Sequence, residues 1–570
     1  MSNVWPAASL EEAARRLTAP GAPFEMTNLQ IDGRSTRVFK ASPATLAECF
    51  AAGRRHGALT FLVNGEERIT FEAFSRATLV LAGHLRASGL RKGERVAIAM
   101  RNLPEWPVAF FATVLAGGVA APLNAWWTGE ELRFALHDCG ARVLIADIER
   151  HDRLIDGPLP DTLETVFVAR GEAAHVGRRL EEVIGRPEAW GDLPEALFAP
   201  EVLQGEDDAT LFYTSGTGGR PKGVIGTHRN AGTNIMALAW SAAVAGLRAG
   251  AAGPDPSQKP QPSSLVSIPF FHATGCLSVL VGALAMGGKL VLTHRFDAAE
   301  ALELIERERV TTAGGVPSIA WELLREAART PHDLSSLETV AFGGAPAAPQ
   351  LVSRILSETP SARPATGWGM TETSAVTLHH MGEDYVRRPE SCGRLIPVCD
   401  ARIVDAAGRD VPLGEAGELW VKGPNIARGY WNRPEDTAST FVDGWVRTGD
   451  IARADAEGFY TIVDRVKDII IRGGENISSV EVENLLFSHP TVVDVAVVGV
   501  PDEVLGEIPA AAVVVADGAS FDPEDLRSYC TGRLAAFKAP ARFLQVQGGL
   551  PRNAAGKVVK PQVRALFEAC

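Results

Sequence analysis

The length of the chain, 570 residues, is the feature that most limits how it can fold. A single hydrophobic core stops growing at roughly 250–300 residues, so a chain of this size divides into two or more domains. Residues 1 to about 200 alternate helix-like stretches with short apolar ones, for example 71–88, 95–100 and 143–147. This alternation favours α/β layers.

The pattern changes in the last third of the chain. After about Asp400, short strand-like stretches joined by glycine-containing turns predict a small β-rich subdomain. After Asp464, helix-like SSVEVENLLFSH and EDLRSYCTGRLAAF alternate with the strand-like VVDVAVVGV and AAAVVVAD. This tail predicts a separate small α+β domain. Before both regions, residues 250–264 are rich in Pro, Gly and Ser and predict an exposed loop.

Charge and cysteine content narrow the class of protein. The formal net charge of -13 argues against nucleic acid or an anionic membrane as the main partner. None of the seven cysteines forms a C-x-x-C pair, so reduced thiols are expected rather than disulfides or a zinc site. No signal peptide is evident, and the longest apolar run, 108–123, is too short to span a membrane. We expect a soluble cytoplasmic protein without an integral membrane segment.

The segment YTSGTGGRPKGV, residues 213–224, is the most informative one for function. Its glycines allow the backbone to approach a ligand closely, and successive N–H groups form an anion-binding nest. Hydroxyls and one lysine add further donors. The segment is not a Walker A motif, because Val224 stands where lysine would follow Gly223, and Pro221 rules out a G-x-G-x-x-G fingerprint.

Five more segments follow in order along the chain: FGGAP (342–346), GWGMTETS (367–374), TGD (448–450), DRVKDIIIRGGENISSVEVE (464–483) and PRNAAGKVVK (551–560). Together with the phosphate loop they resemble the signature motifs of the adenylate-forming superfamily. This superfamily includes acyl-CoA synthetases, firefly-type luciferases and peptide-synthetase adenylation domains. The resemblance covers essentially the whole chain and is closest in pattern to fatty acid or aryl acid:CoA ligases. Gly218 departs from the usual threonine and removes one hydroxyl, but leaves the backbone nest intact.

The resemblance implies a two-step reaction. A carboxylate attacks the α-phosphate of ATP to form an acyl-adenylate and pyrophosphate, and the thiol of coenzyme A then displaces AMP. It implies Lys557, Thr371, Glu372 and His272 as catalytic residues, and Glu372 and Thr217 as ligands of Mg²⁺. Trp368 would pack against adenine and Asp450 would bind the ribose. The full set implied for the nucleotide and CoA is Thr214, Ser215, Gly216, Thr217, Gly218, Gly219, Lys222, Gly344, Ala345, Gly367, Trp368, Gly369, Met370, Asp450, Arg465, Lys467, Gly473 and Gly474.

The same resemblance implies a domain division. A large ATP- and acyl-binding domain, residues 1–465, would precede a small mobile domain, 466–570, with a hinge near Lys467. Rotation about the hinge would replace Lys557 with a face that carries Gly473 and Gly474, beside which the pantetheine arm would pass. A few residues are enough to absorb such a change in backbone angles.

The sequence says less about which carboxylic acid is the substrate. PFFHATG, residues 269–275, resembles the family's acyl-site segment and places His272 beside the acyl group. Gly314, Gly315, Gly343, Gly344 and Ala345 predict a wide tunnel if they line it. PFFHATG contains no carboxylate that could hold a substrate ammonium. We therefore expect a medium- or long-chain fatty acid or a bulky hydrophobic aryl acid.

Three other functions remain open at this point. They are a stand-alone adenylation enzyme that loads a carrier protein, a luciferase-like oxygenase, and a non-catalytic nucleotide-binding regulator. A homodimer is possible.

Overall fold

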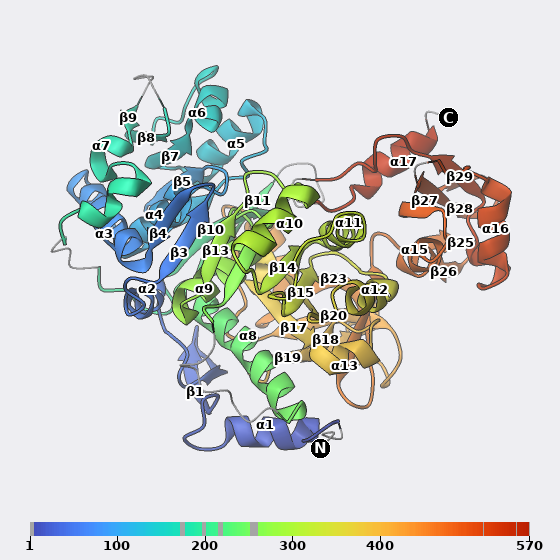
Figure 1. Cartoon of the computed structure of the whole chain (residues 1–570). Helices are drawn as coiled ribbons and strands as arrows, with labels where there is room; N and C mark the ends of the chain where they lie inside the picture. Colours follow the sequence, from blue (N-terminus) through green and yellow to red (C-terminus); the bar gives the residue numbers. More distant parts are fainter. Residues whose placement is uncertain are drawn as a thin grey trace.

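The computed structural model describes residues 5–171, 177–195, 201–214, 221–250, 260–516, 518–553 and 556–568. The chain forms a large body of layered sheets and helices, with the C-terminal segment set to one side of it (Figure 1). Residues that precede β1 (Met26–Ile31) and β2 (Arg34–Phe39) form α1 (Leu10–Thr18), and the two strands pair with each other as an antiparallel ribbon.

One sheet of the large body collects the apolar strands of the N-terminal third. Its order is β21-β11-β10-β6-β5-β7-β8-β9. Parallel strands buried on both faces read as continuous apolar runs, and β5 and β7 show this pattern. The bounds are β5 (Arg95–Ala99), β6 (Val119–Pro122), β7 (Val143–Asp147), β8 (Thr165–Ala169), β9 (Arg178–Arg179), β10 (Asp208–Thr214), β11 (Lys222–Thr227) and β21 (Gly429–Tyr430).

A second, longer sheet runs β19-β20-β23-β24-β18-β17-β16-β15-β14-β12-β13-β3-β4, with β22 paired to β23. Its middle strands are parallel, and its β19–β24 end is antiparallel, which is the predicted β-rich subdomain. The bounds are β3 (Thr60–Asn64), β4 (Glu67–Thr70), β12 (Ser263–Val266), β13 (Lys289–Leu292), β14 (Thr312–Gly315), β15 (Thr339–Gly343), β16 (Arg363–Met370), β17 (Ala375–Met381), β18 (Gly393–Leu395), β19 (Asp400–Val404), β20 (Gly417–Lys422), β22 (Phe441–Val442), β23 (Trp445–Ala454) and β24 (Phe459–Arg465).

Helices cover these sheets and bury large apolar clusters against them. The largest cluster centres on α3 and α4, whose aromatic side chains pack against each other and against Phe270. The α-helices of the large body are α2 (Leu46–Arg54), α3 (Phe71–Ala87), α4 (Glu105–Leu115), α5 (Gly129–Cys139), α6 (Ile148–Ile155), α7 (Glu181–Ile184), α8 (His228–Arg248), α9 (Val281–Met286), α10 (Ala298–Arg307), α11 (Pro317–Ala327), α12 (Gln350–Glu358), α13 (Gly382–Arg387) and α14 (Pro434–Thr440).

The C-terminal segment has a sheet and a core of its own. The sheet order is β26-β25-β28-β27, with β29 beside β28, and its apolar cluster lies between the sheet and the helices. The chain leaves the longer sheet at Arg465 and enters this one at Ile470. The bounds are β25 (Ile470–Arg472), β26 (Glu475–Ile477), α15 (Ser479–Phe487), β27 (Val492–Asp502), β28 (Gly506–Val515), α16 (Pro523–Thr531), β29 (Arg542–Gln545) and α17 (Lys560–Glu568).

The predicted fold class, a large α/β part with a β-rich subdomain and a small α+β part, is confirmed. Two local predictions need correction. Residues 263–264 of the predicted loop belong to β12, because they pair with β13, and residues 251–259 lie outside the described chain. The helix predicted from EDLRSYCTGRLAAF ends at Thr531. In the described part of the chain no helix is long and apolar enough to cross a membrane, and the six cysteines described there are free.

Candidate active site

The segment GWGMTETS forms the end of β16 and a short 3-10 helix, Thr371–Thr373. Gly369 is required by close packing, since a Cβ there would lie 1.5 Å from the carbonyl oxygen of Ala375. Ser374 and Ala375 follow with φ of 52° and 82°, which L-residues rarely adopt. Strained backbone of this kind persists where the surroundings fix it, often at functional sites. The turn holds Thr371 half-buried and Glu372 buried.

Trp368, Asp450 and Arg465 are linked by polar contacts. The indole Nε1 of Trp368 donates to Asp450 Oδ2 at 2.7 Å, and Arg465 Nε lies 3.1 Å from Asp450 Oδ1. Asp450 and Arg465 stand opposite each other on the paired strands β23 and β24. The Asp450 carboxylate is buried with a cation on one side and an indole on the other, so its orientation is fixed before a ligand binds.

Glu372 is held by Tyr430 of β21. The Tyr430 hydroxyl donates to Glu372 Oε1 at 2.7 Å. Burial raises the pKa of Glu372, while the Tyr430 hydrogen bond and the positive charges of Arg465 and Lys557 oppose that rise. The Glu372 carboxylate therefore faces two cations across the site. Among the described residues no group of three or more His, Cys, Asp or Glu side chains could hold a metal ion. A metal that Glu372 holds would need oxygens from its substrates, as Mg²⁺ commonly does.

Lys557 reaches this cluster from the C-terminal segment. An ideal Cβ on Gly344 would lie 3.3 Å from Lys557 Cε, so a side chain at Gly344 would crowd the lysine. Burial and the charge of Arg465 lower the pKa of Lys557 to about 8, although Asp450 and Glu372 act in the opposite direction. A single lysine thus stands among groups from β15, β16, β23 and β24.

His272 is a further predicted residue on which the charge of Lys557 acts. Its buried Nε2 atom has no hydrogen-bond partner within the described chain. Burial and the charge of Lys557 lower the pKa of His272 to about 4, so the imidazole is neutral near pH 7. A buried polar atom without a partner normally costs stability, so this one marks a place for a ligand. A π-helical turn, Thr274–Leu280, follows His272 directly, and such turns are frequent at functional sites.

Aromatic rings continue from His272 toward the surface. The Phe271 ring centroid lies 4.7 Å from that of His272, and Trp126 meets Phe271 edge-on at 6.1 Å. The guanidinium of Arg101 covers the ring of Trp126 at 5.0 Å. The rings therefore form a continuous apolar wall that begins beside the candidate acyl site.

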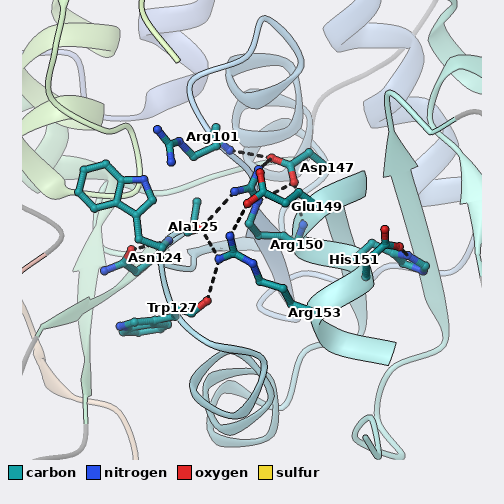
Figure 2. A network of polar contacts seen from close by, with 11 residues as sticks. Arg101, Asn124, Ala125, Trp127, Asp147, Glu149, Arg150, His151 and Arg153 are labelled. Atoms are coloured by element: carbon teal, nitrogen blue, oxygen red, sulfur yellow. Dashed lines mark hydrogen bonds and ion pairs between the residues drawn. The ribbon is translucent and has the colours of Figure 1, made fainter. Parts of the chain in front are cut away.

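A buried charge network fixes the turn that carries Trp126 (Figure 2). Arg150 makes a two-pronged ion pair with Asp147, with distances of 2.6 and 2.8 Å. Both Arg150 and Arg153 donate to the carbonyl oxygen of Ala125, and Arg153 also donates to that of Trp127. Asp147 in turn accepts from the backbone N–H of Arg101 and caps the N-terminus of α6.

The phosphate-loop segment includes the facing ends of β10 and β11, which pair antiparallel with Thr214 opposite Lys222. Lys222 Nζ lies 2.8 Å from Asp436 Oδ1 and 5.2 Å from the centroid of the Tyr430 ring. Tyr430 therefore contacts both Lys222 and Glu372. The residues predicted between the two strands lie outside the described chain: Ser215, Gly216, Thr217, Gly218 and Gly219.

Some predicted residues lie apart from the cluster. Lys467 is exposed in the turn between β24 and β25, and Gly473 and Gly474 form the β25–β26 turn with φ of 59° and 90°. A Cβ on Gly473 would meet Leu505, within the C-terminal segment. These three positions do not join Lys557 in this arrangement of the chain.

The glycines taken to predict a wide tunnel have another explanation. A Cβ on Gly314 would lie 1.8 Å from the Ala341 carbonyl oxygen, and one on Gly343 would lie 3.0 Å from that of Gly367. At Gly315, Ser267 Oγ would be 2.8 Å away. The neighbouring strands thus occupy the space that side chains would take, and these glycines do not indicate the width of a tunnel. Ala345 follows Gly344 and is half-buried.

Two residues of the site were missed by sequence reasoning, Tyr430 and Asp436. Each contacts a predicted residue from a different part of the chain: Tyr430 contacts Glu372, and Asp436 contacts Lys222. An isolated tyrosine in a short strand and an aspartate in a helix's first turn give no periodic or motif signal. Their role follows only from the pairing of β21 with β11.

The arrangement defines a class of protein. One lysine is brought together with a buried carboxylate, the Trp368–Asp450–Arg465 group and a buried imidazole nitrogen without a partner in the described chain. Tyr430 connects this cluster to Lys222 at the edge of the phosphate loop. Such a site suits the joining of a carboxylate to a nucleotide phosphate, where two anions must be held together.

Comparison with known proteins identifies the family. Residues 49–431 match the AMP-binding enzyme family and residues 481–557 match the AMP-binding enzyme C-terminal domain, so the chain belongs to the adenylate-forming superfamily. It is 37% identical over 509 residues to a feruloyl-CoA synthase of Amycolatopsis sp, with 89% of this chain and 96% of the relative covered. It is 32% identical to a long-chain-fatty-acid–CoA ligase of Bacillus subtilis, with 87% and 89% covered.

A solved structure supports the same conclusion. The o-succinylbenzoate coenzyme A synthetase of Bacillus subtilis in complex with ATP and magnesium ion superposes with a TM-score of 0.74 at 29% identity, covering 90% of this chain and 99% of the other. The chain is accordingly an AMP-forming acid:CoA ligase, whose substrates are an acid, ATP and CoA.

Proposed function

We propose that this ligase activates a hydrophobic monocarboxylic acid, and that Lys557 joins the acid to the α-phosphate of ATP. The Lys557 ammonium would contact both the attacking carboxylate and the α-phosphate, which are otherwise two anions that repel each other. Thr371 would contact the same phosphate from the turn after β16. Rate enhancement in such transfers comes from positioning and charge stabilisation rather than from an enzyme nucleophile.

The observation that carries the proposal is the position of Lys557. Its charge acts both on Glu372 and on His272. The unpaired His272 Nε2 atom is available to a carboxylate or acyl oxygen. Asp450, already oriented by Trp368 and Arg465, would accept the ribose hydroxyls. The nucleotide and the acid would therefore meet at the lysine.

The residues present also fit Mg²⁺. Glu372 offers a buried carboxylate beside the hairpin of the phosphate loop, and Tyr430 leaves its second oxygen available for a metal. When bound, the ion would neutralise charge on the departing pyrophosphate. Thr217 would be a second ligand. Lys222, held by Asp436 and Tyr430, would add a positive charge at the mouth of the same hairpin.

We infer that the preferred substrate is an aryl acid rather than a fatty acid. The wall of rings next to His272 offers edge and face contacts that suit an aromatic substrate. The feruloyl-CoA synthase, a relative named for an aryl acid, is also more similar to this chain than the fatty acid ligase described above. A long alkyl chain would gain burial along the same wall but no ring-to-ring geometry.

We also propose that residues 1–465 and 466–570 are the two moving domains, with Lys467 as the hinge. The change of sheet between Arg465 and Ile470 supports this division. The exposed Lys467 turn can change its backbone angles without disturbing either core. After rotation, Gly473 and Gly474 would lie where Lys557 stands now, beside the pantetheine arm of CoA.

A panel of acids tests the substrate class. Cinnamic-type aryl acids and saturated acids of increasing length are incubated with ATP, Mg²⁺ and CoA, and acyl-CoA and AMP are measured together. We expect the highest kcat/KM for an aryl acid, with kcat/KM falling by roughly ten-fold for fatty acids, the size of a few lost ring contacts. A clear preference for long fatty acids would overturn the aryl assignment. Preference for an amino acid would overturn the hydrophobic monocarboxylate as well.

A further inference from the structure

One face of α11 contacts the C-terminal segment far from the hinge. Arg325 Nη2 donates to the carbonyl oxygen of Val493, in β27, at 2.9 Å. The guanidinium of Arg325 also lies near the ring of Trp321, 5.9 Å from its centroid, which limits its freedom. Figure 1 shows α11 on the side of the large body that faces the C-terminal segment. This contact crosses between the two parts of the chain.

Charges of alternating sign surround the contact. Glu322 and Arg325 lie one turn apart on α11, while Asp494 and Arg552 belong to the C-terminal segment and pair with each other at 2.5 Å. Arg325 interacts electrostatically with Asp494, and Glu322 with Arg552. Partial burial raises the pKa of Glu322, and the positive charges of Arg552 and Arg325 oppose the rise. Each part of the chain thus contributes one acid and one base, and each acid attracts the base of the other part.

Arg552 connects this charge cluster to the lysine of the site. Its Nη1 donates to the carbonyl oxygen of Gly556 at 2.6 Å, and Arg552 pairs with Val558 as an isolated bridge. Asn553 accepts from the backbone N–H of Lys557 and donates to its carbonyl oxygen. The turn that carries Lys557 is therefore held by the same arginine that faces Glu322.

We propose that Glu322 and Arg325 of α11 form a docking site for the Asp494–Arg552 pair, and that this docking places Lys557 in the active site for the first half-reaction only. Arg325 and Arg552 are then positioning residues. The contact must break when the small domain rotates, so it stabilises the adenylate-forming arrangement over the thioester-forming one. The proposal rests on the proposed role of Lys557 and adds the residues that hold it there.

The test compares Arg325→Glu with Arg329→Glu, which makes the same charge change at an exposed position just beyond α11. Two rates are measured separately: pyrophosphate release from acid and ATP without CoA, and acyl-CoA formation from supplied acyl-adenylate and CoA. We expect Arg325→Glu to lower the first rate by about ten-fold or more and to leave the second within about two-fold, as for loss of one coupled charge contact. Arg329→Glu should match the wild type in both.

Arg325→Lys provides a rescue, because lysine keeps the charge and can still donate to the Val493 carbonyl oxygen. Partial recovery of the first rate supports the docking role. If Arg325→Glu does not fold, as judged by thermal unfolding, Arg325→Gln replaces it in the same two assays. Equal loss of both rates in a folded variant, or an unchanged first rate, would overturn the inference. If the wild type itself releases no pyrophosphate with any acid, the proposed function falls first, so the two failures are told apart.

Discussion

At the scale of single residues, the proposed function gives Lys557 the central role. Burial and Arg465 work against its charge, and Asp450 and Glu372 preserve it, with the pKa left at about 8. The lysine is thus close to neutral in the empty site at moderately alkaline pH. Two substrate anions would restore the charge when they bind. The favourable binding of these anions would offset the cost of burying the charged form of Lys557.

A pH profile of the first half-reaction follows from this value. Only the protonated Lys557 can bridge the two anions, so kcat/KM for pyrophosphate release should fall as pH rises through about 8. Lys557→Ala should lower that kcat/KM by roughly a hundred-fold or more and abolish the alkaline decline. Thioester formation from supplied acyl-adenylate should be spared. A wild-type profile that stays flat up to pH 10 would contradict the role given to the lysine.

Glu372 makes a second prediction at this scale. Glu372→Gln keeps the size and the Tyr430 contact of the side chain but removes its charge. The concentration of Mg²⁺ that gives half-maximal pyrophosphate release should rise by about ten-fold, since Mg²⁺ prefers carboxylate oxygens. Tyr430→Phe, which removes only the hydrogen bond to Glu372, should cause a smaller change. A metal titration that superimposes on that of the wild type would exclude Glu372 as a ligand.

At the scale of elements, the turn between β24 and β25 is the connection between the large body and the C-terminal segment. It separates two sheets, and we propose that its exposed Lys467 changes backbone angles when the C-terminal part rotates. Lys467→Pro fixes φ near roughly -65° and removes an N–H. We expect pyrophosphate release to persist while acyl-CoA synthesis collapses, with Lys467→Ala close to the wild type in both assays. Acyl-CoA synthesis by the folded proline variant at the wild-type rate would place the pivot elsewhere.

The Asp147–Arg150 network predicts a stability effect. Asp147 and Arg150 are almost completely buried, at 4% and 2% side-chain exposure, so removing Asp147 leaves the buried Arg150 guanidinium with only the exposed Glu149 as an ion-pair partner among the described residues. Asp147→Ala should therefore lower the free energy of unfolding by about 3 kcal/mol or more. Glu149→Ala removes an exposed acid that also contacts Arg150, and should cost about 1 kcal/mol or less. Denaturant unfolding measures the loss of unfolding free energy in both variants. Equal losses would contradict the stabilising role given to the buried Asp147–Arg150 pair.

Sequence reasoning found the parts of the site that are encoded in short motifs. Trp368, Glu372, Asp450 and Lys557 were expected together, and the structure places them around one point. Contacts such as Arg325 with Val493 join residues far apart in the chain, where neither periodicity nor a motif gives a signal. The spacing of residues along the sequence also does not show which strand packs against a given glycine.

Glycine content was the misleading signal. The missing side chain of Gly314 was taken to leave room for a ligand, but the backbone of β15 occupies the position where that side chain would lie. The β-rich subdomain and the separate C-terminal sheet were predicted correctly, because strand alternation and turn residues are local properties. Local sequence patterns predict helices and strands, whereas the shape of an acyl-binding site depends on tertiary packing.

At the scale of the whole molecule, the proposed function assigns the present arrangement to the first half-reaction. In this arrangement Lys557 lies in the cluster, and we propose that the Arg325 and Arg552 contacts hold it there. Gly473 and Gly474 stand apart from the cluster in this arrangement. Under the proposed function, one chain would present two different faces to one bound intermediate, and the balance between the two arrangements would set which half-reaction proceeds.

Isotope transfer tests the central claim most directly. The acid is labelled with ¹⁸O at both carboxylate oxygens and incubated with ATP, Mg²⁺ and CoA, and the products are analysed by mass spectrometry. Attack of the carboxylate on the α-phosphate predicts one ¹⁸O atom in AMP, one in the acyl-CoA carbonyl and none in pyrophosphate. Unlabelled AMP, or label in a phosphate product other than AMP, would contradict activation through an acyl-adenylate.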